Sequence, residues 1–189
     1  SKLAATPYEI IVSPFEVYLT TGTDSFPQIA TTPSGGWVLL GTNGKNNQAE
    51  GGVEVKHSQE LGYVFVEGRT GPVKAYRTKE NQSVKFTLYD LATNIYKHAL
   101  NGDAPTADSS TVDSIGLSRS ENVRELKMMI RGPSPRANNA NSQYELPRVD
   151  QAGSPATKFS KTGPSGLSFE FMSLEDTASA TTGARFGTL

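Results

Sequence analysis

The sequence predicts a mainly β protein, an antiparallel β-sandwich or half-barrel with one flanking α-helix and long extended loops. Short apolar runs, separated by Gly, Pro or Asn, recur about every ten residues, as in antiparallel sheets and barrels. Only one segment has the apolar spacing of an amphipathic helix. Gly (18 residues) and Pro (11 residues) supply many turn formers. We expect one domain over residues 1–189, because a chain of this length can bury a core without disulfides or metals.

The first strand pattern is the apolar, β-branched run Tyr8–Leu19, which Pro14 interrupts. Because proline cannot donate a hydrogen bond to a sheet, this run predicts an edge strand or two strand pieces around a bend. Residues 20–52 are then polar and rich in breakers, apart from Trp37–Leu40. A loop this long is uncommon inside a compact domain, so we expect an arm that packs on a partner.

Four short strands follow in quick succession, separated by Gly or Asn breakers: Val53–His57, Leu61–Val66, Val73–Arg77 and Ser83–Leu88. In the last of these, Val84, Phe86 and Leu88 alternate with polar residues, which predicts one buried and one solvated face. We expect the aromatic residues of the strand patterns to pack in the core rather than to form a sugar-binding platform; they are Tyr63, Phe65, Tyr76, Phe86, Phe169 and Phe171.

The helix is expected over Tyr89–Leu100, where apolar residues recur with a spacing of three or four. Thr87 or Asp90 can cap its N-terminus, and Gly102 comes just after its end. Residues 101–120 form a polar loop, and this loop and the two termini are further candidate arms.

Three strands are expected in the second half of the chain. Arg124–Arg131 places Leu126, Met128 and Ile130 on a buried face and the residues between them, Glu125, Lys127, Met129 and Arg131, on the other. Tyr144–Val149 contains Pro147, which predicts an edge position. Leu167–Leu174 alternates again, and residues 132–143 and 153–166 are loops.

Composition and charge exclude several classes of protein. The absence of Cys excludes disulfide scaffolds, Cys-ligated metal centres and thiol nucleophiles. No apolar segment is long enough to span a membrane, and the chain begins without a signal-peptide pattern, so we expect a protein made and kept in a cytosol or built into something assembled there. A net charge of −1 does not favour tight nucleic-acid binding, which depends on a surplus of Lys and Arg.

Catalytic and metal-binding patterns are sparse. His57 ends a strand and His98 lies near the helix end, and neither has neighbours that suggest catalysis or metal binding. Asp103, Asp108 and Asp113 recur every five residues, but without the ligand spacing of a calcium-binding loop. We therefore expect no catalytic, cofactor-binding or metal-binding residues and no enzymatic activity; the missing chemistry favours a protein whose function is its shape.

Six pieces of the first half occur in an order that resembles the major tail tube proteins of long-tailed, non-contractile (siphovirus-type) bacteriophages. The resemblance covers residues 17–102. No single piece is a chemical signature, but the order and spacing of the pieces make the resemblance moderately specific. The pieces are Val17–Pro27, Ser34–Gly44, Glu50–Val55, Thr70–Glu80, Val84–Leu91 and Ala99–Gly102.

The resemblance implies a structural subunit of a phage tail tube. Six copies would close into a ring around a β-barrel lumen, and rings would stack into a hollow conduit for DNA ejection into the host. Implied partners are other copies of the chain, a tape measure protein, a tail terminator, baseplate or tail-tip proteins, and genomic DNA that passes through without specific binding; no membrane partner is implied. The location would be the virion tail, assembled in the bacterial cytoplasm. A wall that DNA must pass is expected to be neutral to acidic.

Three alternatives remain open from the sequence. One is another structural part of a virion or secretion tube, such as a baseplate hub, a tail terminator or a decoration protein. Another is a β-sandwich module that binds a carbohydrate or a protein, which would require exposed aromatic residues in a groove. An enzyme is the third and would require a pocket with perturbed titratable groups.

Overall fold

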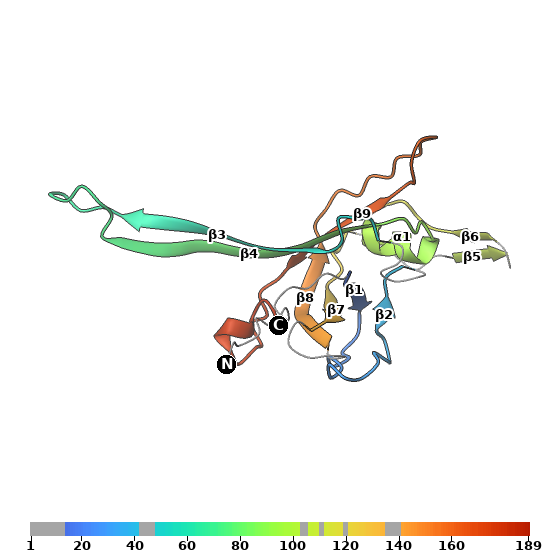
Figure 1. The fold of residues 1–189 in the computed structure, drawn as a ribbon, viewed down its shortest axis with the longest axis horizontal. Helices are drawn as coiled ribbons and strands as arrows, with labels where there is room; N and C mark the ends of the chain where they lie inside the picture. Colours follow the sequence, from blue (N-terminus) through green and yellow to red (C-terminus); the bar gives the residue numbers. More distant parts are fainter. Residues whose placement is uncertain (1–13, 42–47, 103–105, 110–111, 119–120, 135–140) are drawn as a thin grey trace, which may run out of the picture.

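A computed structural model describes residues 14–41, 48–102, 106–109, 112–118, 121–134 and 141–189 (Figure 1). The main sheet is antiparallel, and its seven strands lie in the order β2-β1-β7-β8-β9-β4-β3. A two-stranded ribbon, β5 with β6, lies apart from it. The bounds are β1 Glu16–Thr20, β2 Val38–Leu39, β3 Glu54–Val64, β4 Lys74–Leu88, α1 Thr93–Leu100, β5 Thr106–Ser109, β6 Val112–Ser114, β7 Leu126–Pro133, β8 Asn141–Gln151 and β9 Leu167–Ser173. The prediction of a mainly β, antiparallel protein with a single helix is confirmed.

The sheet curves so that its two halves enclose one core. In Figure 1, β3 and β4 run across the half formed by β1, β7 and β8. Val53 and Val55 pack against the same apolar cluster as Ile130 of β7 and Tyr144 of β8. Stacked phenyl rings fill the centre, with Phe86 and Phe169 5.0 Å apart between centroids. A single curled sheet therefore provides the half-barrel.

Helix α1 is shorter than predicted. It begins at Thr93, because the Asp90 side chain accepts a hydrogen bond from the Ala92 N–H (3.1 Å) just before the first turn. At its end Asn101 takes a left-handed conformation (φ 56°), and the Gly102 N–H bonds the Lys97 carbonyl at 2.8 Å. Ile95 and Ala99 belong to the apolar stripe of α1 and pack in the core.

The four short strands predicted between residues 53 and 88 are wrong. β3 and β4 are two long strands of 11 and 15 residues, paired from Glu54 with Lys85 to Val64 with Lys74. Gly62 does not break β3, because the ring of Tyr76 on β4 lies over it. The polar residues around Asn81 do not break β4, since a strand exposed on both faces needs no apolar alternation.

The predicted edge position of Tyr144–Val149 is also wrong. β8 lies between β7 and β9 in the interior of the sheet. The register slips between the pairs Leu126–Val149 and Met128–Leu146, so that two residues of β8 oppose one of β7. Pro147 lies in this bulge, where an interior strand tolerates a residue without an N–H.

Residues 24–32 cover the outer face of β7, which the sequence predicts to be solvated. Arg131 is only 7% exposed and donates to the carbonyls of Thr31 (2.6 Å) and Gln28 (3.2 Å). Met129 beside it is fully buried. The prediction of a solvent-facing Met129 and Arg131 is wrong, because this loop supplies a second buried layer.

The candidate arms differ in how much of them the structure describes. Within residues 20–52, the part around residues 24–32 docks on its own domain, and residues 42–47 lie outside the described residues. In residues 101–120, β5 and β6 pair with each other. The predicted strand piece before Pro14 and the N-terminal arm also lie outside the description. At the other end, the Thr188 carbonyl accepts a bond from the Glu145 N–H (2.8 Å).

Candidate assembly surface

The main unpartnered feature is the outer part of the β3–β4 hairpin, residues 56–81, which we call the hairpin arm. It projects from the body as a two-stranded ribbon (Figure 1). Every residue in it is exposed apart from the half-buried Gly62, and the first buried side chain of β4 is Gln82. The eight residues Lys74–Asn81 of β4 alone span about 25 Å at the usual rise of a strand.

Polar cross-strand contacts hold the inner half of the hairpin arm together. Arg77 bonds Glu80 on its own strand at 2.8 Å and Gln59 on β3 at 3.0 Å. On the opposite face Lys79 pairs with Glu60 at 3.1 Å. Thr78 lies at a bulge opposite Glu60 and Leu61 and donates to the Glu60 carbonyl. Exposed ion pairs of this kind contribute little free energy each, but together they fix the register.

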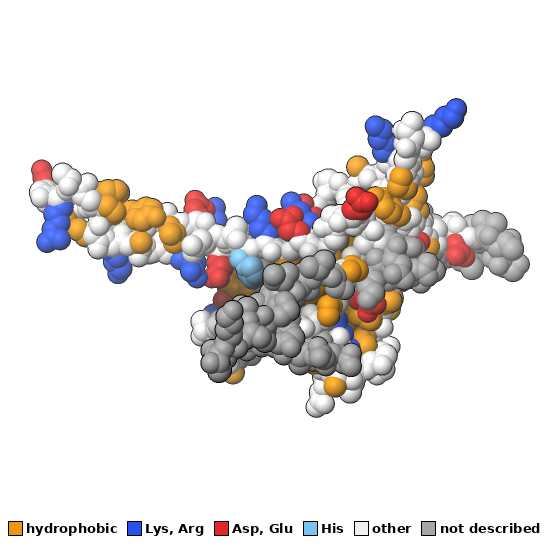
Figure 2. Space-filling view, in the orientation of Figure 1, with side chains coloured by type: hydrophobic (Ala, Val, Ile, Leu, Met, Phe, Trp, Pro, Cys, Tyr) orange, Lys and Arg blue, Asp and Glu red, His pale blue; other side chains and the backbone are white. Residues whose placement is uncertain are grey.

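The outer half of the hairpin arm is apolar. Figure 2 shows hydrophobic side chains gathered towards its far end. Half of the exposed large hydrophobic side chains among the described residues lie here, and Phe65 at the turn is 64% exposed. These side chains, which we call the apolar tip, are Leu61, Tyr63, Val64, Phe65, Val66, Val73 and Tyr76. A cluster of this size is typical of a surface that another molecule covers.

The aromatic residues predicted to lie in the core divide into two groups. Phe86, Phe169 and Phe171 are buried and stacked, as predicted. Tyr63 and Tyr76 are 52% and 50% exposed, so their predicted place in the core is wrong, as it is for Phe65. The run Tyr63-Val64-Phe65-Val66 is apolar at consecutive positions, and a strand buried on both faces has the same pattern, so the sequence alone does not separate an exposed run from a buried one.

Strand β3 is also the last strand of the sheet. Its outer edge pairs with no other described strand over 11 residues. Unpaired backbone donors and acceptors on a long edge are a template for another strand, and isolated proteins usually shorten or cover such edges. The hairpin arm therefore offers both an apolar surface and an open edge.

The residues considered for catalysis or metal binding lie apart. His57 is exposed on β3 beside Gln82, whereas His98 is buried on α1. Asp113 is exposed on β6, Asp103 is outside the described residues, and the side chain of Asp108 is not described. Among the described residues, no three His, Cys, Asp or Glu side chains gather as metal ligands.

Two half-buried residues of the main sheet, Tyr18 and Asp150, have pKa values that burial raises. Burial and the nearby Glu16 carboxylate, which accepts its hydrogen bond, raise the pKa of Tyr18 to about 12. Burial also raises the pKa of the Asp150 carboxyl. Tyr18 lies on β1 and Asp150 on β8, so the two groups belong to different strands.

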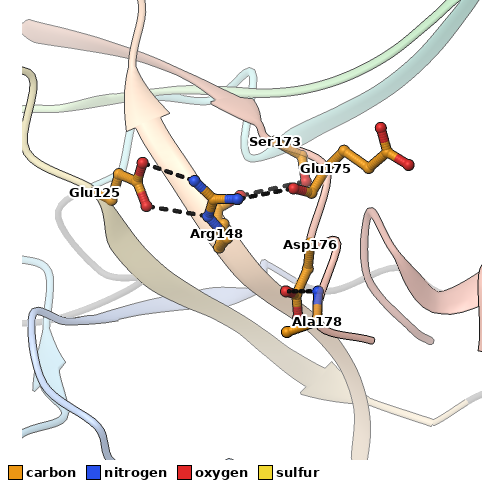
Figure 3. A network of polar contacts seen from close by, with 6 residues as sticks. All are labelled: Glu125, Arg148, Ser173, Glu175, Asp176 and Ala178. Carbon is orange, nitrogen blue, oxygen red and sulfur yellow. Dashed lines mark hydrogen bonds and ion pairs between the residues drawn. The ribbon is translucent and has the colours of Figure 1, made fainter. Parts of the chain in front are cut away.

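A polar network ties the C-terminal segment to β8 (Figure 3). Arg148 contacts both carboxylate oxygens of Glu125, at 3.0 and 2.7 Å, which lowers the pKa of that carboxyl. It also donates to the Glu175 carbonyl at 2.9 Å. The Glu175 side chain pairs with Arg185 at 2.8 Å. This network fixes residues 175–185 beside the bulge of β8.

Comparison with models of known protein families gives no match, and comparison with curated proteins gives none either. No helix among the described residues has the length and apolar character needed to cross a membrane.

Proposed function

We propose that this chain is a structural subunit of a phage tail tube, in which six copies close into a ring and rings stack into a hollow conduit for DNA. The observation that carries the proposal is the hairpin arm, with its apolar tip and its open β3 edge. The mainly β fold with one helix and the ordered resemblance of residues 17–102 to major tail tube proteins support it.

The apolar tip supplies a driving force for self-association. Fully burying a large apolar side chain is worth about 1.5–3 kcal/mol, and each of the seven side chains of the apolar tip, which are 39–64% exposed, can gain a part of this. A single chain has no described element that reaches them. Because the arm extends about 25 Å beyond the body, it reaches across a neighbouring copy.

The open edge of β3 supplies the geometry of ring closure. When the free edge of one sheet pairs with a strand of the next copy, the sheets continue into each other, and a closed ring leaves no edge exposed. Such a contact joins two different surfaces, so it propagates around a ring. Tape measure, terminator and tail-tip proteins would meet the lumen and the ends of the stacked rings.

The test is negative-stain microscopy and sedimentation of the purified full chain across a concentration series. We expect rings or tubes for the wild type and a shift to monomer for the triple variant Tyr63→Ser, Phe65→Ser, Tyr76→Ser. The matched control is Leu117→Ser with Val123→Ser, two apolar side chains that are 73% and 60% exposed and lie off the hairpin arm. The control should assemble as the wild type does.

Two results would overturn the proposal. One is a wild-type chain that stays monomeric at all concentrations. The other is a monomer that binds an oligosaccharide or a protein ligand through the apolar tip, which would favour the binding-module alternative. Circular dichroism of each variant separates loss of assembly from loss of folding.

A further inference from the structure

The segment between β8 and β9 carries a second exposed apolar side chain, Phe159, which lies apart from the hairpin arm. Residues 152–166 project from the body at the upper right of Figure 1, and Figure 2 shows Lys or Arg at their far end. Phe159 is 77% exposed there, with Lys158 and Lys161 also exposed beside it. We call residues 158–161 the tip of this segment, as distinct from the apolar tip of the hairpin arm. No acidic residue occurs between Asp150 and Glu170, so the tip of the segment carries a local charge of about +2.

A shallow pocket lies on a different side of the body, next to the C-terminal segment. Phe26, Pro147 and Ala184 give the pocket apolar walls, and Glu145 and Asp176 also line it. Its volume is about 170 Å³. An apolar cavity of about 150 Å³ can hold a benzene ring, so this pocket has room for the side chain of a phenylalanine.

Glu145 and Asp176 give the pocket a negative charge, and the nearby Arg148, which is paired with Glu125 (Figure 3), also interacts electrostatically with Asp176. Arg185 is engaged with Glu175. Neither Glu145 nor Asp176 is in an ion pair within the described part of the chain. Each accepts a hydrogen bond at one oxygen, from the Gln143 side chain and the Ala178 N–H respectively.

We propose that Phe159 of one copy inserts into this pocket of a second copy, with Lys158 and Lys161 beside Glu145 and Asp176. The shape and charge of the two surfaces are complementary: an aromatic ring between two cations faces a ring-sized pocket with two carboxylates. Residues 152–166 and the C-terminal segment that borders the pocket lie on different sides of the body (Figure 1), so we expect the tip and the pocket to meet between copies, and the contact repeats head to tail. This inference rests on the proposed self-assembly and assigns it a contact separate from the hairpin arm.

A charge-exchange experiment tests the contact. Variant A carries Lys158→Glu and Lys161→Glu, and variant B carries Glu145→Lys and Asp176→Asn, where Asn keeps the acceptor for the Ala178 N–H. We expect each variant alone to assemble at least about tenfold more weakly than the wild type, because tip and pocket then repel or no longer attract. An equimolar mixture should recover assembly, since A and B then alternate with attractive contacts.

The inference and the proposed function fail in different ways. If wild type, A, B and the mixture assemble equally, the tip–pocket contact is wrong and the tube proposal stands. If the wild type itself does not assemble, the tube proposal fails. If A loses binding to anionic vesicles or DNA while B assembles like the wild type, the tip serves another partner and the inference is overturned.

Disulfide trapping gives a second measurement that does not depend on affinity. The chain contains no Cys, so Ser160→Cys with Ser179→Cys introduces the only thiols, one at the tip and one at the pocket. Oxidation of the double variant should give a ladder of covalent oligomers, whereas each single variant can give dimers at most. A double variant that also stops at dimers contradicts a head-to-tail contact.

Discussion

At the scale of single residues, Arg131 shows how this chain buries a cation with carbonyl and amide oxygens as its hydrogen-bond acceptors. Its guanidinium donates to the side-chain oxygen of Gln143 at 2.9 and 2.6 Å and to two loop carbonyls. Its planar fork of donors can satisfy several acceptors at once. The alternation of β7 could not predict this, because the acceptors belong to residues about 100 positions away in the sequence.

His98 is the second residue whose position has an energetic consequence. It is 8% exposed on α1, and its Nε2 has no hydrogen-bond partner in the part of the chain that the structure describes. Burial, with smaller effects of Lys97 and Arg124, lowers its pKa to about 4. The folded protein therefore holds this imidazole neutral where an unfolded chain would begin to protonate it.

We predict an acid-dependent loss of stability from His98. Its pKa falls from about 6.5 in the unfolded chain to about 4 in the folded one, so its contribution is complete above pH 6.5 and is lost as the pH falls towards 4. The loss is about 3 kcal/mol over that interval. Urea unfolding of the wild type and of His98→Leu at pH 7, 6, 5 and 4 gives the free energy of unfolding of each protein. The difference between the two proteins at each pH measures the contribution of His98, because the carboxylates contribute equally to both. Parallel pH profiles would contradict the prediction.

At the scale of elements, the hairpin arm is an addition to the fold and not part of its core. The apolar cluster begins at Val55 and Val84, on the body side of the pair His57–Gln82. The arm outside this pair contributes no buried side chain. Its loss should therefore leave the body folded.

We predict that replacing Ser58–Asn81 with a two-residue Asn-Gly turn changes the thermal midpoint by only a few degrees, as expected for surface changes away from the core. The same variant should form no rings or tubes, because it lacks the apolar tip. Differential scanning calorimetry and microscopy of one preparation measure both effects. Unfolding of the truncated chain would show that the arm is structural, and assembly without it would overturn its proposed role.

The elements differ in how well the sequence predicts them. β1, α1, β7 and β9 each have an apolar stripe that contacts one core, and periodicity locates such stripes to within a few residues. The length of β3 and β4 could not be found this way, because their outer halves bury neither face. The interior place of β8 depends on a bulge that accommodates Pro147, which is a property of the pairing with β7. Three aromatic residues of the apolar tip, Tyr63, Phe65 and Tyr76, were misplaced in the core, since an exposed and a buried strand can have the same residue pattern.

At the scale of the whole molecule, charge is balanced locally as well as in total. The net charge is −1, and on the outer face of β3, β4 and β9 two lysines are paired: Lys79 with Glu60, and Lys85 with Glu170 at 2.9 Å. A lysine beside a carboxylate attracts phosphate less than a free one does. This pairing suits the proposed passage of DNA without retention.

We predict that the assembled wild type gives no shift of double-stranded DNA in gel electrophoresis at 150 mM salt. The double variant Glu60→Gln, Glu170→Gln should bind detectably at low salt, with affinity that falls as salt rises, because it removes the carboxylate with which each of the two lysines forms its ion pair. Glu125→Gln with Glu175→Gln changes the net charge equally but frees Arg148 and Arg185 at the C-terminal segment. Tight, salt-resistant binding by the wild type, or equal binding by the two variants, would contradict the prediction.

The length of the hairpin arm also has a mechanical consequence. The arm is a lever: a rotation of about 10° at its base displaces a tip about 25 Å away by about 4 Å. The bulge opposite Thr78 lies partway along this lever, at a point where the ladder is already interrupted. When a neighbouring copy binds the apolar tip, bending between the two copies is distributed along the hairpin arm and does not open the packed core of either copy. A column built from such subunits curves by flexing its arms while every contact surface stays in place.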